Sequence, residues 1–441
     1  MAMRTLALCV CAALLGVLVG LADAKSATGS RVLVLVPKPE SLNKYSHVLE
    51  TLAQRGFDVT ATQATNASAA LHNDGVRTYD HAMLLSPGSK SFGAGLTIRE
   101  FIRFVDDGGN LVLAASPEAS EFHRKLAAQF GVDFEKPGTL AIDHVANLKD
   151  GDAGDHTIVA SSRFARAPAV LSPRFVQSSN PDPVYFKGIA HRYSGSPLLV
   201  PLLTASRTTY SGKKDASGEA SVSSGKSLGL VSVFQTRSNA RVAVTGGVTL
   251  FSDALIQRAG DGNRQFVDDI LQWTFQEKAV LRETAHRHYL AATGERPEHY
   301  RINNEIVYEV DLSVYHDDAW HAYAADDVQF EATMLDPYIR ATLNRTRAAD
   351  PTATYRGDIR LPDRYGTFTF RVNYKRTGFS NVDVADTVGI WPLRHDEYPR
   401  FLLAAYPYYA GSLVMVVGFL MLCMAWLWSA EPSKAKKAKT E

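Results

Sequence analysis

Two serines stand where an α/β enzyme could hold a nucleophile. Ser86 follows the apolar stretch "HAMLL" and Ser116 ends "LVLAAS", and each stretch has the composition of a buried strand. Serine hydrolases of the α/β class place the reactive hydroxyl directly after a strand, but within a G-x-S-x-G turn. Neither serine lies in such a turn, so we expect both to cap turns, and we predict no catalytic residue in this chain.

Two aspartates offer a weaker case for metal chemistry. Asp150 and Asp152 lie in "KDGDAGDH" and fit the D-x-D pattern with which many glycosyltransferases hold a metal-bound sugar nucleotide. Two carboxylates on one turn can share a cation, but Asp and Gly also favour turns through their own backbone preferences. We expect an ordinary polar turn here and predict no bound metal.

Glycine-rich loops and histidines do not supply a cofactor site. The loop after the first predicted strand reads "PKPESLNKY" and lacks the G-x-G-x-x-G through which a pyrophosphate approaches the backbone. The stretch "GSKSFGAG" comes closest to a phosphate loop, but Ala94 stands where lysine is needed. His286 and His288 are two apart, which puts them on different sides of a helix, so we expect a solvated surface pair. We predict no cofactor.

Two tripeptides match the acceptor sequence for N-glycosylation. They begin at Asn66, in "NAS", and at Asn344, in "NRT". Such acceptors are used only on the far side of the membrane that an exported chain crosses. Asn66 and Asn344 are therefore candidate glycosylation sites if the chain is exported.

The N-terminus has the three parts of a secretory signal peptide. Residues 1–24 contain Arg4, an apolar run, and the small-residue site "ADA" that ends at Ala24. A retained anchor is the alternative, but the apolar run is shorter than the roughly 20 residues that a spanning helix needs. We expect cleavage after Ala24.

A second apolar segment, at residues 406–429, is long enough to cross a bilayer of about 30 Å as a helix. No charged residue occurs between Arg400 and Glu431, and tyrosine and tryptophan mark the two ends of the segment. Aromatic rings favour the headgroup level, and lysines after a span favour the cytosolic side. The sequence predicts a single-pass, type I membrane protein with a cytosolic tail at 430–441.

The tail has a second interpretation besides orientation. Lys437 and Lys439 are fifth and third from the end, a K-x-K-x-x spacing similar to the dilysine address that returns type I proteins to the endoplasmic reticulum. Such a signal is read by a receptor and is not an anchor. Lysines that follow a span also fix topology, so both explanations stay open.

Composition excludes two further features. The formal net charge is +1 and basic clusters are sparse, which argues against a nucleic-acid partner. The three cysteines are Cys9 and Cys11, in the predicted signal, and Cys423, in the predicted span. The exported part therefore has no disulfide framework, and its stability must come from large cores or partner subunits.

The pattern of elements predicts three folded regions before the span. Residues 25–150 alternate buried strands such as "RVLVLVP" with helices such as "IREFIRFVDDGG", which indicates an α/β domain with a parallel sheet. Residues 151–290 indicate a mixed, β-rich middle region, with an exposed Gly/Ser-rich loop at 211–227 and a closing helix at Asn263–Leu281. Residues 300–395 alternate apolar and polar side chains, which favours an antiparallel β-sandwich near the membrane.

Several long stretches resemble one known family. They read "QTRSNARVAVTGGVTLFSD", "DDVQFEATMLDPYIRATL", "RLPDRYGTFTFRVNYKRTGF" and "YPRFLLAAYPYYAGSLVMVVGF", in this order. The chain is similar in them to the 48 kDa, non-catalytic subunits of the oligosaccharyltransferase complex of the endoplasmic reticulum membrane. The specificity of this resemblance lies in the length and order of the stretches, since none of them is an active-site motif.

The resemblance implies a structural role in protein N-glycosylation. That complex transfers a preassembled glycan from dolichyl diphosphate to Asn in N-x-S/T, and a different, multi-span subunit performs the chemistry. The expected partners are the other subunits and the membrane. Two alternatives remain on sequence grounds: a self-sufficient membrane-anchored enzyme, either a hydrolase or a glycosyltransferase, and a cell-surface receptor.

Overall fold

The computed structural model describes most of the chain outside its two ends. The described residues are 26–66, 69–90, 92–93, 95–148, 156–178, 181–213, 224–316, 318–398, 400 and 402–429. Several predicted features lie outside them, namely the signal peptide, Asp150 and Asp152, residues 214–223 of the Gly/Ser-rich loop, and the tail with Lys437 and Lys439.

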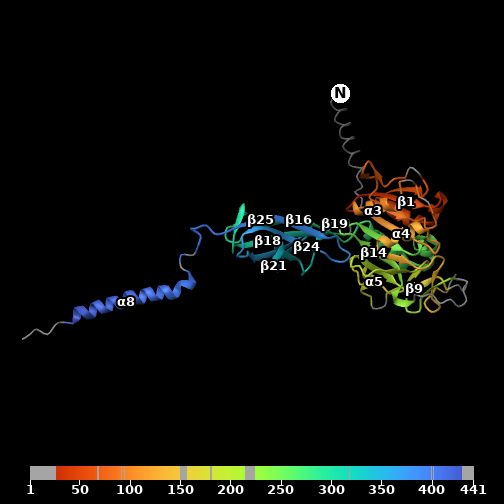
Figure 1. The fold of residues 1–441 in the computed structure, drawn as a ribbon. Coiled ribbons are helices and arrows are strands. Elements are labelled where there is room, and N and C mark those ends of the chain that lie inside the picture. Colours follow the sequence, from red (N-terminus) through yellow and green to blue (C-terminus); the bar gives the residue numbers. More distant parts are fainter. Residues whose placement is uncertain are drawn as a thin grey trace, which may run out of the picture.

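A nine-stranded mixed sheet forms the first domain, which comprises residues 26–279 (Figure 1). Its first five strands are parallel, as predicted for an α/β domain, and run in the order β2 (Asp58–Gln63), β1 (Arg31–Val36), β5 (His81–Leu84), β6 (Asn110–Ala114), β15 (Arg241–Thr245). The sheet continues through antiparallel strands β14 (Gly229–Gln235), β11 (His191–Tyr193) and β7 (Val132–Phe134), and β12 (Leu199–Thr204) pairs with β14.

The continuity of this sheet differs from the expected division near residue 150. Strands from both sides of that position hydrogen-bond in one sheet, with β15 directly beside β6. The middle region is therefore part of the first domain. The first domain also contains three two-stranded sheets: β3 (His72–Asn73) with β4 (Val76–Arg77), β8 (Leu140–Ile142) with β13 (Tyr210–Gly212), and β9 (Val159–Ser161) with β10 (Val184–Phe186).

Apolar side chains on both faces of the sheet explain the uninterrupted β1 sequence. Val32 and Val34 enter one core with helices α2 (Ser46–Gln54), α5 (Pro173–Val176), α6 (Asp253–Ala259) and α7 (Asp261–Thr274). Leu33 and Leu35 enter the opposite core with α3 (Ile98–Asp106) and α4 (Glu121–Gln129). Each fully buried side chain of this size contributes about 1.5–3 kcal/mol, so strands of this kind need helices on both faces. Short 3-10 turns connect the layers: η1 (Pro39–Lys44), η2 (Gly225–Ser227) and η3 (Val248–Phe251).

Helix α3 illustrates how the local sequence sets the boundaries of an element. The Thr97 side chain accepts a hydrogen bond from the backbone N–H of Glu100, at 3.2 Å, which satisfies one free donor of the first turn. Phe101, Phe104 and Val105 form the buried stripe. Gly108 follows the helix with φ +91°, a left-handed conformation that glycine adopts without a Cβ clash.

The second domain is a sandwich of two five-stranded sheets. One sheet contains β16 (Val280–Leu290), β18 (Glu305–His316), β19 (Ala319–Ala322), β22 (Asn344–Ala349) and β23 (Thr352–Arg360). The other contains β17 (His299–Arg301), β20 (Gln329–Met334), β21 (Asp336–Thr342), β24 (Gly366–Tyr374) and β25 (Val382–Trp391). Alternate residues such as Tyr308 and Phe370 meet in its core, in agreement with the predicted period of two.

The closing helix is shorter than predicted. It ends at Thr274, not at Leu281, because Gln276 and Ala279 have φ of 57° and 59° and cannot continue a right-handed helix. Residues 280–290, which the sequence analysis grouped with the middle region, form β16 and pair along nearly their whole length with β18.

A single long apolar helix, α8 (Tyr406–Trp428), stands apart from both domains (Figure 1). The short turn η4 (Leu403–Ala405) precedes it, and none of its side chains is buried within the described part of the chain. Its length and composition are those of a membrane-spanning helix. The segment that leads to it leaves the end of the sandwich that faces away from the first domain.

Candidate functional site between the two domains

The two candidate serines lie at the carboxyl ends of neighbouring parallel strands. Ser86 follows β5 and Ser116 follows β6, which is the edge of the sheet where open α/β proteins bind ligands. Ser86 is fully buried, and its hydroxyl has no hydrogen-bond partner. The carbonyls of Ser86 and Ser116 accept turn hydrogen bonds from Ser89 and Ala119, at 3.1 and 2.9 Å. Both serines therefore begin tight turns.

Backbone packs closely at the carboxyl end of β15, on this sheet edge. A Cβ added to Gly246 would lie 1.7 Å from the carbonyl oxygen of Ile189, and one added to Gly247 would lie 2.4 Å from that of Lys187. The backbone of Val248 donates a hydrogen bond across the same edge to the carbonyl of Ala115, at 2.7 Å. Backbone packed this closely leaves no room for a side chain at Gly246 or Gly247.

Two serine–histidine pairs, which sequence reasoning missed, lie elsewhere in the first domain. The Ser232 hydroxyl is 2.8 Å from Nε2 of His191, and the Ser120 hydroxyl is 3.1 Å from Nδ1 of His123. Burial lowers the pKa of His191 to about 3 and that of His123 to about 4. The second ring nitrogen of each histidine has no partner. Neither pair has the carboxylate that orients the base in a catalytic triad.

The histidines of β16 form an ion-pair cluster and not the solvated surface pair expected from a helix. Residues two apart on a strand share one face, so His286 and His288 both approach Asp386 of β25, at 3.1 and 3.3 Å. His288 is 2% exposed, and its Nδ1 lies 2.7 Å from the Tyr300 hydroxyl. Among the described residues, no three His, Cys, Asp or Glu side chains are placed to hold a metal ion.

Both candidate glycosylation sites are on the surface. Asn66 lies after β2 and is exposed, and its Nδ2 donates to the Thr62 hydroxyl at 3.0 Å. Asn344 begins β22 and is also exposed. Access therefore does not exclude either acceptor.

A concentrated polar arrangement joins the two domains. The loop between β24 and β25, residues 375–381, returns from the sandwich to the first domain, and we call it the seam loop. Its Gly378 carbonyl accepts a hydrogen bond from Nε1 of Trp273, at 2.7 Å, and its Phe379 carbonyl accepts one from Gln235, at 2.7 Å. Asn239 and Asn381 exchange two hydrogen bonds, at 2.6 and 3.0 Å.

Arg241 lies under the seam loop and is completely buried. Its guanidinium donates hydrogen bonds to the carbonyls of Trp273, Lys278 and Ala279, each at 2.8 Å, and a longer one to the hydroxyl of Ser380. The guanidinium carbon also lies 4.8 Å from the centre of the Trp273 ring. Burial lowers the pKa of Arg241 to about 9, so the side chain is still protonated at neutral pH. One cation therefore ties the end of α7, the residues just before β16 and, through Ser380, the seam loop to β15.

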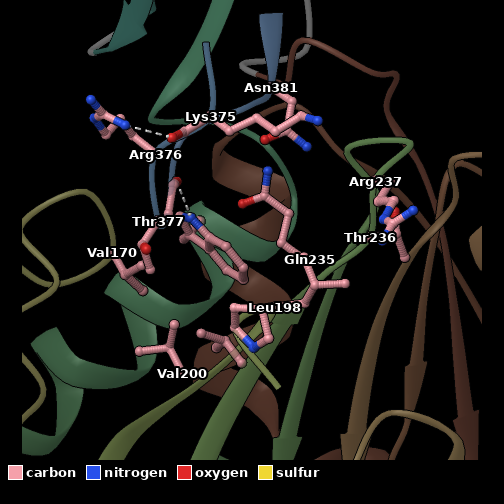
Figure 2. Close-up of a pocket in the computed structure, with 14 residues that line it drawn as sticks. Val170, Leu198, Val200, Gln235, Thr236, Arg237, Lys375, Arg376, Thr377 and Asn381 are labelled. Carbon is pink, nitrogen blue, oxygen red and sulfur yellow. Dashed lines mark hydrogen bonds between the residues drawn. The ribbon is translucent and has the colours of Figure 1, made fainter. Parts of the chain in front are cut away.

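A cavity of about 520 Å³ opens beside this seam (Figure 2). Val170, Leu198 and Val200 of the first domain form an apolar wall, and Lys375 and Arg376 of the seam loop lie across from it, as Figure 2 shows. No described residue that lines the cavity is a carboxylate or a histidine. The cavity offers apolar contacts, amides and cations, so it can bind but has no general base.

No sequence pattern pointed to this seam. Arg241 begins the apolar stretch "RVAVT", and Trp273 lies within the predicted closing helix Asn263–Leu281. The only signal was an arginine inside an otherwise apolar strand, "RVAVT", which is costly unless the charge is satisfied.

Comparisons with known proteins cover nearly the whole chain. The family description "OST48, N-terminal domain" matches residues 23–277, and "OST48 middle domain" matches residues 288–430. The interval between the two matches contains the junction of the first domain and the sandwich.

Curated relatives match at full length. The "dolichyl-diphosphooligosaccharide–protein glycosyltransferase 48 kDa subunit" of Arabidopsis thaliana is 33% identical over 420 residues, which is 91% of this chain and 93% of the relative. The protein of the same name from Caenorhabditis elegans is 32% identical over 425 residues, covering 92% and 93%. The "subunit wbp1" of that glycosyltransferase from Schizosaccharomyces pombe is 31% identical over 409 residues, covering 90% and 92%. Among solved structures, a ThuA-like protein from Parabacteroides merdae covers 56% of this chain and 89% of its own length at 18% identity, with a TM-score of 0.32.

Proposed function

The chain belongs to the OST48 family, and from that membership we propose that it is a non-catalytic structural subunit of the oligosaccharyltransferase complex in the endoplasmic reticulum membrane. The complex carries out protein N-glycosylation, the transfer of a glycan from dolichyl diphosphate to asparagine. The observation that carries the proposal is identity of 31–33% with 48 kDa and wbp1 subunits along 90–92% of the chain.

The geometry of the first domain supports a role without chemistry. Backbone packs tightly at Gly246 and Gly247 on the sheet edge where an α/β enzyme would act, and Ser86 on the same edge is buried. In the Ser232–His191 and Ser120–His123 pairs, burial of each histidine keeps it neutral. A single apolar helix cannot enclose a lipid-linked sugar, so we assign catalysis to another, multi-span subunit.

The seam supports a role as a scaffold. Hydrogen bonds from Trp273, Gln235, Asn239 and Arg241 fix the sandwich to the first domain. The three short bonds of the Arg241 guanidinium hold the end of the first domain in place, and its bond to Ser380, at 3.3 Å, crosses to the seam loop. Such a junction transmits a fixed orientation from the membrane-side sandwich to the first domain.

The proposed topology is single-pass and type I. Helix α8 spans the membrane, both domains lie in the lumen, and the lysine-rich tail lies in the cytosol, in keeping with aromatic residues at both helix ends and lysines after it. Asn66 and Asn344 then face the compartment in which acceptors are glycosylated.

Purification of the full-length chain from membranes in mild detergent tests the proposal. We expect co-purification with a multi-span glycosyltransferase. Within that complex, alanine at Ser86, Ser116, Asp150 or Asp152, one at a time, should leave glycan transfer within about threefold, or under about 0.7 kcal/mol of barrier. A hundredfold loss with unchanged assembly would show that this chain has an active site. Isolation from the cell surface without other subunits would favour a receptor instead.

The tail gives a separate proposal. We assign Lys437 and Lys439 as a retrieval signal that returns unassembled copies to the endoplasmic reticulum. Lys437→Ser with Lys439→Ser leaves Lys434 and Lys436 to fix orientation. Unassembled copies should then reach the Golgi, while alanines added after Glu441 should do the same without changing charge. Retention of both variants when overexpressed would refute this assignment.

A further inference from the structure

The exposed apolar side chains of the sandwich gather at one end. Leu335 lies between β20 and β21, Tyr365 lies just before β24, and Trp391 ends β25, with exposed fractions of 104%, 68% and 50%. Strand register places them together, because Gly366 pairs with Ile390 and Thr333 pairs with Thr369. Tyr338 of β21, packed edge-on against Phe368, joins them. We call Leu335, Tyr338, Tyr365 and Trp391 the distal tip.

This clustering is selective. Apart from the distal tip, the segment after Trp391 and helix α8, the described residues have only two large apolar side chains that are exposed. These are Val76 and Val145, which lie in the first domain. Scattered exposed apolar residues need no explanation, but a group of large ones at one end marks an interaction surface.

Leu335 has an unusual backbone conformation in addition to its fully exposed side chain. Its φ is 67°, in the left-handed region that leucine rarely adopts. A strained residue that also leaves its whole side chain in water gains nothing from packing within this chain. Residues held in such conformations cluster at functional positions.

The distal tip is tied to the membrane by a short segment. Trp391 ends β25 and Tyr406 begins α8, so 14 residues, 392–405, separate them. Fully extended, this segment reaches at most about 50 Å, and a flexible chain of that length averages about 20 Å. Figure 1 shows the segment leaving the sandwich at the end opposite the first domain.

Two arginines near the distal tip are paired with carboxylates. Arg301 lies over the Trp391 ring at 5.9 Å and pairs with Glu397 at 3.2 Å. Arg340 pairs with Glu331 at 2.8 Å, while Arg364, next to Tyr365, is exposed. Tyrosine, tryptophan and leucine supply the apolar surface of the tip, and these side chains favour the headgroup level of a bilayer.

We propose that the distal tip docks into the lumenal leaflet of the membrane, with Leu335 in the acyl boundary and Tyr338, Tyr365 and Trp391 at the headgroups. This inference rests on the proposed topology, in which α8 spans the membrane and the sandwich is lumenal. The tip then gives the sandwich a second attachment besides the short segment 392–405, and it fixes the tilt of the two domains over the bilayer.

A single reporter group can test this docking. The only cysteine outside the predicted signal peptide is Cys423, so Leu335→Cys with Cys423→Ala gives one site for an environment-sensitive fluorophore. The full-length chain is reconstituted in phosphatidylcholine vesicles and oriented by selecting protein whose first domain faces outward. Val76→Cys in the same background is the matched control, because Val76 is 71% exposed but lies in the first domain.

We expect a blue-shifted spectrum at position 335 and roughly threefold or more stronger quenching by headgroup-proximal nitroxide lipids than at position 76, since contact with the interface is short-ranged. Iodide in the buffer should quench position 76 preferentially. Equal quenching of both positions by iodide would overturn the inference. Resistance to alkaline extraction is measured on the same vesicles to show whether α8 is inserted. Extraction of the chain would refute the proposed topology, whereas an inserted chain with equal quenching at both positions would refute the docking.

The same labels in the purified complex decide between lipid and protein. Quenching by nitroxide lipid at position 335 supports docking in the native assembly. Protection of position 335 from both lipid nitroxide and iodide would show that another subunit covers the distal tip, and it would overturn the membrane assignment. Leu335→Asn is tested beside Leu335→Cys, because asparagine tolerates the left-handed conformation. If only the cysteine variant loses assembly with the complex, that loss reflects misfolding at position 335.

Discussion

Replacing Arg241 tests whether the seam holds the two domains in one orientation. Arg241→Ala removes the guanidinium that donates to the carbonyls of Trp273, Lys278 and Ala279, each at 2.8 Å. All three acceptors lie in buried backbone at the junction of α7 and β16. The variant therefore removes three charge-assisted hydrogen bonds; the carbonyls of Trp273 and Ala279 keep backbone donors in Gln276 and Ser380, and the carbonyl of Lys278 loses its donor.

The expected loss of stability follows from these three contacts. Each lost hydrogen bond to the charged group costs about 1.5–3 kcal/mol, the unpaired Lys278 carbonyl costs about 1–3 kcal/mol, and relief of the desolvated charge returns part of this sum. We expect a net loss of about 3–4 kcal/mol in the free energy of unfolding. For a domain of this size, 1 kcal/mol corresponds to about 2–4 °C, so the unfolding midpoint should fall by roughly 6–16 °C. Arg241→Lys should give an intermediate loss, because one ammonium cannot reach all three carbonyls.

Thermal unfolding of the purified full-length chain in detergent, followed by tryptophan fluorescence, measures this effect. Arg237→Ala is the matched control, because Arg237 lies four residues away and is exposed beside the cavity. Limited proteolysis provides a second readout, since a loosened seam loop should be cut near residues 375–381. If the midpoints of the Arg241→Ala and Arg237→Ala variants agree within 1 °C, and cleavage is unchanged, the reasoning about the seam is wrong.

Three further changes test the physical account, each by unfolding midpoints. Burial lowers the pKa of His191 from 6.5 to about 3, so its contribution to the free energy of unfolding is complete above pH 6.5 and falls below it, where the unfolded chain takes up a proton first. His191→Gln should reduce this acid-dependent loss by about 1.4 kcal/mol per pH unit between pH 6.5 and 4. An unchanged dependence of the unfolding midpoint on pH in that range contradicts this. Burial would raise the pKa of Asp143, but hydrogen bonds from Ser206, Ala146 and other donors lower it to about 2. Asp143→Asn should therefore lower the free energy of unfolding by about 2 kcal/mol at pH 7. A change near zero would show that these hydrogen bonds do not stabilise the fold. Leu335→Asn should keep or raise stability by about 0.5–1 kcal/mol through relief of left-handed strain, and a marked loss would mean that Leu335 packs within the fold.

Local periodicity predicted the parts of the fold that depend on neighbouring residues. The apolar run of β1 indicated a strand with both faces covered, and the structure places Val32 and Leu33 in opposite cores. In the same way, the apolar stripe of α3 predicted its buried face, and the alternation of apolar and polar residues in β18 and β24 predicted strands with one buried face. In each case burial is decided by spacing within a single element, which the sequence displays.

Features that depend on distant residues were not predictable in this way. Residues 280–290 follow α7 after only five residues, and pairing with β18 makes them a strand. The sheet joins β6 to β15, which are separated by more than a hundred residues, so the expected boundary near 150 had no physical basis in the fold. The prediction of a solvated histidine pair on a helix was wrong for the same reason. His286 and His288 lie on strand β16, where they share a face and contact Asp386.

The placement of buried polar groups separates this chain from an α/β enzyme of similar layout. An enzyme concentrates unsatisfied, perturbed side chains at the carboxyl ends of its strands, where substrate can complete them. Here Gly246 and Gly247 pack against backbone at the carboxyl end of β15, and the most demanding buried charge, Arg241, lies at the opposite end of that strand and donates four hydrogen bonds within the chain. Three of its acceptors are carbonyls that lead into β16, and the fourth is Ser380 of the seam loop, so these bonds lie where the two domains join. A buried polar network at a domain boundary is suited to holding a shape for partner subunits, which is the role proposed for this member of the OST48 family.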